Sequence, residues 1–150
     1  MIISLNGIYL DTKNIYTRDE AWRKAILYTP EPCGYYDCVY FVLECFNIEF
    51  DIKYLLNYGW WRNSNILEPF IDKFIKKGIL IQIDESKIEP GDMVITKNYN
   101  RSYYHHVSII LDEVKAIGYA EKKKVKIDYK DSFIGYYLKW SEQLWESKQL

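Results

Sequence analysis

The chain has 150 residues, of which 49% are hydrophobic and 27% charged, and its net charge is −1 at pH 7. This length and composition predict one globular domain over residues 1–150, with a core that needs no disulfide or metal. The near-neutral charge argues against a nucleic-acid partner, because such proteins need a basic face.

The cysteine count excludes a closed disulfide framework. There are three cysteines, Cys33, Cys38 and Cys45, and no Cys-x-x-Cys pair. An odd number leaves at least one free thiol, and the spacing is not that of a zinc site. The N-terminus lacks the basic region of a signal peptide, and no apolar run has the length of a membrane span. We therefore expect reduced thiols, no metal, no membrane partner and a protein that is cytoplasmic as synthesised.

The first half of the chain is predicted to be helical. Thr17 and Glu20 have the spacing of a capping box, which predicts a helix over 17–27. A second helix is predicted over 37–46, where apolar positions follow at helical spacing. A third is predicted over 65–77, with one apolar stripe. A short amphipathic stretch over 140–150 is a candidate last helix.

The second half of the chain is predicted to form strands. They span 79–83, 92–96, 107–111, 114–119, 124–127 and 133–138. Residues 107–111 are apolar on both faces, so this strand should be central. The lysines at 122–124 fit a solvated hairpin turn. Helices followed by a meander of strands predict an α+β domain, with N-terminal helices packed on an antiparallel sheet.

Two segments carry residues with catalytic potential. In Gly34-Tyr35-Tyr36-Asp37-Cys38, a cysteine falls in the first turn of a predicted helix. Free backbone N–H groups at a helix N-terminus favour a thiolate, which is the nucleophilic form, and can hold an oxyanion. The other reading is that Cys38 is a small core residue, as we expect of Cys45.

The second segment places a histidine before the central strand. After Glu89-Pro90-Gly91-Asp92, the chain continues through a loop to His105-His106-Val107. An imidazole at the start of that strand can face the helix N-terminus and accept the thiol proton. His105 should point to the opposite side of the strand from His106, because strand side chains alternate. Alone, such a histidine is as well explained by a structural role.

In this order, the segments resemble the NlpC-type family of cell-wall peptidases. The matching residues are Asp37, Cys38, Gly91, Asp92, His106 and Val107. The resemblance spans residues 28–138 and is greatest to compact phage and prophage members. It implies a papain-like fold that hydrolyses amide bonds in peptidoglycan stem peptides, with no cofactor. It also implies delivery to the cell wall by a phage particle or a secretion apparatus.

The resemblance also assigns roles around the pair. Cys38 is the nucleophile, His106 is the base, and a third group orients the imidazole. By counting, that third position falls near Gly118, which has no side chain, so Tyr119 and Glu121 are the nearest polar candidates.

An oxyanion or substrate role falls to Tyr28, Tyr36 and Asp37, and Tyr35 is an equivalent candidate. Core packing explains the tyrosines equally well.

The chain departs from the family pattern after the cysteine, where Val39-Tyr40 replace the usual Ser-Gly. Gly118 also offers no side chain at the third position. Both features favour an alternative function, that of a non-catalytic binding or phage-assembly module that retains the fold. Trp60-Trp61 would then be candidate anchors of an interface, or else core residues. A further alternative is a thioester-forming acyltransferase, because a thioester can pass to an amine as well as to water.

Overall fold

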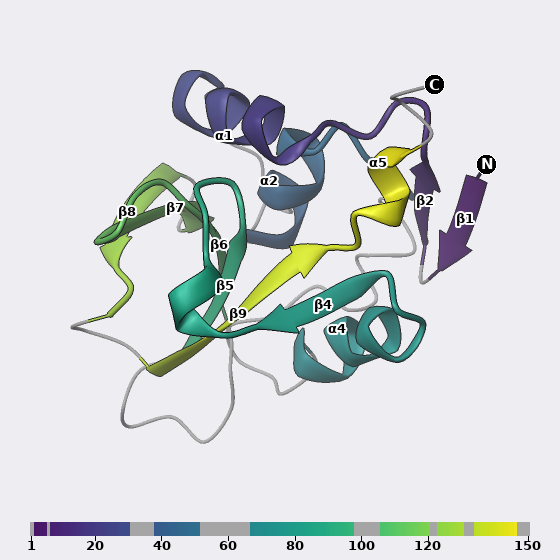
Figure 1. Cartoon of the computed structure of the whole chain (residues 1–150). Helices are drawn as coiled ribbons and strands as arrows, with labels where there is room; N and C mark the ends of the chain where they lie inside the picture. Colours follow the sequence, from purple (N-terminus) through teal and green to yellow (C-terminus); the bar gives the residue numbers. More distant parts are fainter. Residues whose placement is uncertain are drawn as a thin grey trace.

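The computed structural model describes residues 2–5, 7–30, 38–51, 67–97, 106–120, 123–130 and 134–146. Its elements form an α+β arrangement of antiparallel sheets and helices (Figure 1). In chain order they are β1 (Ile2–Leu5), β2 (Ile8–Asp11), α1 (Arg18–Leu27), α2 (Cys38–Cys45), β3 (Glu49–Phe50), α4 (Leu67–Lys76), β4 (Leu80–Ile83), the 3-10 turn η2 (Glu85–Lys87), β5 (Met93–Lys97), β6 (His106–Ile110), β7 (Lys115–Ala120), β8 (Lys123–Asp128), β9 (Ile134–Trp140) and α5 (Gln143–Glu146).

The main sheet has six strands in the order β4-β9-β5-β6-β7-β8. All six predicted strands are present, and β6 is central and buried, as predicted. The expectation of a simple meander is wrong for the last strand. β9 lies between β4 and β5, pairing Leu138 with Met93 on one side and with Gln82 on the other. This position covers both edges of β9 with hydrogen-bonding partners, which a strand beside β8 would not have.

The helices begin and end where local chemistry predicts. Thr17 caps α1, and the capping box with Glu20 is complete. Lys124 at the start of β8 donates from Nζ to the Ile26 carbonyl, 2.9 Å away, at the other end of α1. This lysine therefore serves a helix end rather than a solvated turn. After α4, Gly78 has φ of +72°, the left-handed conformation expected at a helix C-terminus.

The six-stranded sheet has two differently covered faces. The helix face carries Ile95, Val107, Ile109, Ile117 and Tyr119, which share a core with α1, α2 and α4. The second face carries alternate residues of the same strands, which are Val94, Thr96, His106, Ser108, Ile110, Ala116 and Gly118. Figure 1 shows α1 and α2 stacked over β6, and α4 beside β4.

A small second sheet was not predicted. β1, β2 and β3 pair antiparallel, and β2 places Ile8 and Leu10 in the core. The N-terminal strands are only four residues long, too short for a clear alternation. The predicted C-terminal helix is present as α5. Its Trp145 donates from Nε1 to the Tyr16 carbonyl at 3.0 Å, which ties this end of the chain to the start of α1.

Candidate functional site

Cys38 is the first residue of α2, and this helix points its N-terminus toward the start of β6. The Phe41 ring, one turn after Cys38, stacks on Tyr119 with ring centroids 6.4 Å apart. Tyr119 lies near the end of β7, beside the start of the antiparallel β6. Just after the other end of α2, the Phe46 ring packs on Trp140, with ring centroids 5.8 Å apart. Trp140 lies at the end of the sheet where β9 ends and β5 begins. Cys38 is therefore at the His106 end of the sheet.

The position expected to hold the third catalytic group does lie next to His106. A Cβ built on Gly118 would be 3.0 Å from His106 Nε2 and 3.0 Å from Ser108 Oγ. Any larger residue here would touch the imidazole. The structure thus places Gly118 beside His106, with no side chain to orient the ring. The location of a third catalytic group stays a prediction.

His106 does not face α2 across the sheet, which corrects the predicted orientation. Its ring shares the second face with Gly118 and Ser108, whereas Val107 and Tyr119 are on the helix face. The alternation of strand side chains is the reason, since residues one apart point to opposite faces. Tyr119 therefore packs in the helix-side core, and the assignment of Tyr119 as the group that orients His106 is not supported.

Tyr28 is held at the wrong end of α2 for an oxyanion role. Its hydroxyl donates to Glu44 Oε2 at 2.9 Å, and Glu44 is in the last turn of the helix. Lys24 Nζ also lies 5.2 Å from the centre of the Tyr28 ring. These contacts join the C-terminal ends of α1 and α2, so Tyr28 has a structural role here.

The other cysteine of α2 behaves as predicted, as a packing residue. Cys45 is fully buried, and burial raises the pKa of its thiol to about 12. Lys24 and Lys124 lower this pKa, but they do not offset the loss of contact with water. At neutral pH Cys45 is a protonated thiol, and it provides an inert internal reference for Cys38.

Several predicted residues lie outside the described part of the chain. They are Cys33, Tyr35, Tyr36, Asp37, Trp60, Trp61, His105, Glu121 and Lys122. The roles proposed for Tyr36, Asp37 and Glu121 therefore stay predictions.

Gly91 and Asp92, from the second segment, connect the sheet to α1 through contacts with Arg18. Gly91 has φ of +94°, and a Cβ there would overlap the backbone carbonyl of Arg18. Asp92 is 1% exposed and accepts hydrogen bonds from the Glu89 amide at 2.8 Å and from Arg18 Nη1 at 3.2 Å. Arg18 also pairs with the Glu89 carboxylate. The motif thus positions α1 on the sheet.

The buried Asp92 carboxyl predicts a pH dependence of stability. Burial raises the pKa of Asp92, although Arg18 and the Glu89 amide oppose this and the Glu89 charge adds to it. The folded protein therefore holds this proton more tightly than the unfolded chain does. The resulting stability is fully present below the unfolded pKa of about 3.9 and is lost as pH rises through the folded pKa.

Urea unfolding between about pH 3 and pH 7 checks this expectation. The free energy of unfolding of the wild type should fall with pH relative to that of Asp92→Asn. Asp84→Asn is the control, because hydrogen bonding to Ser86 lowers the pKa of the exposed Asp84, which gives the opposite sign. Equal slopes for the wild type and Asp92→Asn would contradict the prediction.

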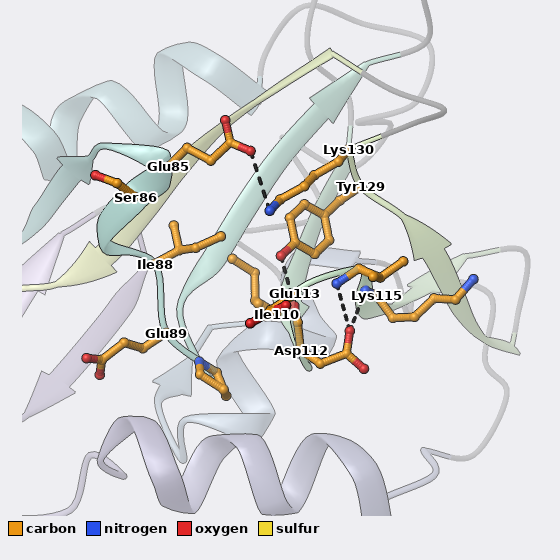
Figure 2. A pocket seen from close by; sticks show the side chains of 12 residues that line it. Glu85, Ser86, Ile88, Glu89, Ile110, Asp112, Glu113, Lys115, Tyr129 and Lys130 are labelled. Atoms are coloured by element: carbon orange, nitrogen blue, oxygen red, sulfur yellow. Dashed lines mark hydrogen bonds and ion pairs between the residues drawn. The ribbon is translucent and has the colours of Figure 1, made fainter.

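Sequence reasoning missed a groove at the far end of the sheet from His106. Its volume is about 900 Å³. It is lined by η2, the turn between β6 and β7, and the end of β8, with Ile88, Ile110 and Tyr129 as apolar floor. Figure 2 shows Tyr129 pointing to Asp112, and the Tyr129 hydroxyl donates a hydrogen bond of 2.8 Å to the Asp112 carbonyl. The same view shows the ion pair of Lys130 with Glu85. No local motif predicts it, because three separate segments build it.

Within the described residues, no cluster of histidine, cysteine and carboxylate side chains could hold a metal ion. In the same part of the chain, no helix has the length and apolar character needed to cross a membrane. A scan against models of known protein families, a search of curated proteins and a search of solved structures each return no match.

Proposed function

We propose that the protein is a papain-like thiol amide hydrolase in which Cys38 is the nucleophile and His106 the base. The observation that carries the proposal is that Cys38 starts α2 at the end of the sheet where β6 begins with His106. Gly118 borders the imidazole at Nε2, and we assign acceptance of the thiol proton to Nδ1.

The proposal requires His106 to meet Cys38 around the end of β6, because the ring is on the second face and α2 is on the helix face. The thiol proton passes to the imidazole, and the thiolate adds to an amide carbonyl carbon. The C–N bond breaks as the imidazolium protonates the leaving amine, which leaves a thioester on Cys38. A water that gives its proton to His106 then hydrolyses the thioester.

The substrate class comes from the resemblance of the Cys38 and His106 segments to NlpC-type enzymes. On that basis we infer that the substrates are peptidoglycan stem peptides, reached through a phage particle or a secretion system. Val39 and Tyr40, which follow the nucleophile, are both buried. They narrow the space around the helix start, and a substrate preference different from the usual Ser-Gly members is expected.

Alkylation kinetics of Cys38 test the pair directly. With iodoacetamide from pH 5 to 9 and detection by mass spectrometry, Cys38 should react well below the usual thiol pKa of about 8.5. His106→Ala should slow the reaction at pH 6 by roughly tenfold or more, because the thiolate loses its counter-charge.

His105→Ala is the matched control for that experiment. It removes the neighbouring imidazole and should leave the Cys38 rate unchanged. A Cys38 that is indifferent to both substitutions would end the hydrolase proposal. If His105→Ala slows the alkylation of Cys38 and His106→Ala does not, the assignment of His106 as the base is wrong.

A second candidate function is a non-catalytic binding module. Two observations favour it: the glycine at the third position and the groove of about 900 Å³ away from His106. That volume is in the range of ligand sites. Such a module needs no activated thiol, so it predicts a Cys38 alkylation profile with a midpoint near 8.5, the value of an ordinary thiol.

A further inference from the structure

Ser108 stands out on the second face of the sheet because its hydroxyl is buried beside the His106 ring. It follows His106 by two residues on β6, so both side chains point the same way. The point where a Gly118 side chain would begin is 3.0 Å from Ser108 Oγ and 3.0 Å from His106 Nε2. Both polar atoms therefore pack against Gly118, whose missing side chain lets them approach the same point.

The state of the hydroxyl gives a second, independent observation. Ser108 is 0% exposed, and among the described residues its Oγ has no hydrogen-bond partner. A buried hydroxyl without a partner is costly, so a hydrogen bond from the neighbouring Nε2–H to Oγ is favoured over an unpaired hydroxyl.

We propose that Ser108 is the positioning residue of His106, replacing the third side chain that Gly118 lacks. Ser108 Oγ accepts a hydrogen bond from His106 Nε2–H, directly or through one water. This holds the tautomer in which Nδ1 is the acceptor, and it supports the imidazolium once the thiol proton is transferred. The inference rests on the proposed function in so far as His106 is the base for Cys38.

Thr96 is the natural competitor and provides a control. It lies opposite His106 in the β5–β6 register, is also 0% exposed, and within the described residues its Oγ1 likewise has no partner. The three atoms nearest to the Gly118 position, however, belong to His106 and Ser108. Thr96→Val removes an equivalent buried hydroxyl from the same face.

The experiment uses the whole chain labelled with ¹⁵N-histidine, which gives only two imidazoles to resolve because the sequence has two histidines. His105→Gln assigns the spectrum. In the wild type we expect His106 as the Nε2–H tautomer. Ser108→Ala should convert it to a mixture and slow Cys38 alkylation at pH 6 by about threefold to tenfold, the effect of one hydrogen bond. Ser108→Thr should restore both, and Thr96→Val should change neither.

The outcomes separate the inference from the proposed function. If Ser108→Ala leaves the His106 tautomer and the Cys38 rate unchanged while His106→Ala still slows alkylation, the positioning role is overturned and the hydrolase survives. If Ser108→Ala changes the tautomer but Cys38 ignores His106, the contact stands and the hydrolase fails. A purely structural hydroxyl predicts a variant that is equally or more stable with an unchanged spectrum, which also overturns the inference.

Discussion

Cys38→Ala is expected to abolish amide hydrolysis and the fast alkylation, a loss of at least about a thousandfold in kcat/KM, because no other described thiol can replace the nucleophile. Cys38 is nearly fully buried at the start of α2, so the substitution should cost only about 1 kcal/mol of stability. Hydrolysis is measured on synthetic stem peptides by chromatography, and folding by the urea midpoint. A folded, inactive variant is the expected result.

Cys45→Ala is the matched control, because it makes the same substitution at the other end of α2. Its thiol has a pKa of about 12, so it should contribute nothing to alkylation at pH 6. Activity should be unchanged while stability falls, because Cys45 is fully buried in the core. Residual hydrolysis by Cys38→Ala, or its loss in a folded Cys45→Ala, would contradict the assignment of the nucleophile.

Gly91→Ala is expected to be the most damaging single substitution for the fold, with a cost of about 3 kcal/mol or more. The added Cβ would overlap the Arg18 carbonyl, which is backbone and cannot rotate away. The left-handed φ of +94° adds strain for any residue with a Cβ. Separating α1 from the sheet would also weaken the Arg18–Asp92 pair. Urea unfolding monitored by tryptophan fluorescence measures the effect.

Gly78→Ala separates the cost of backbone strain from the cost of steric overlap. Gly78 also has a positive φ, +72°, but a Cβ there meets nothing within 4 Å. Only the backbone strain remains, so the expected loss is about 1 kcal/mol. If both substitutions cost the same, close contact with α1 is not what makes Gly91 necessary. The comparison also tests whether the Gly91-Asp92 motif is structural, as we conclude.

The second face of the sheet carries apolar residues toward one end and polar residues toward the other. Ile110 and Ala116 bury apolar surface beside Tyr129, while His106, Ser108 and Thr96 place polar atoms further along the same face. Gly118 lies on β7, between β6 and β8, and His106 and Ser108 pack against it. This face therefore offers a small polar site at one end and, at the other, the groove near Tyr129 (Figure 2).

Local signals in the sequence are sufficient to predict which segments form helices and strands in most of the chain. The capping box of Thr17 and Glu20, the left-handed Gly78 and the apolar run of β6 each act through neighbouring residues. Such local signals depend on side-chain sterics and backbone hydrogen bonding, which need no distant partner. The position near Gly118 came from the resemblance to NlpC-type enzymes, and the structure places Gly118 beside His106.

How those elements meet depends on packing between segments that are distant in the chain. β6 is apolar on both faces, so its alternation does not reveal which face carries α2, and the direction of His106 followed from packing rather than pattern. The insertion of β9 between β4 and β5, and the commitment of the Tyr28 hydroxyl to Glu44, both join residues far apart in the chain. Their free energy comes from burying surfaces that exist only once the helices and the sheet are assembled.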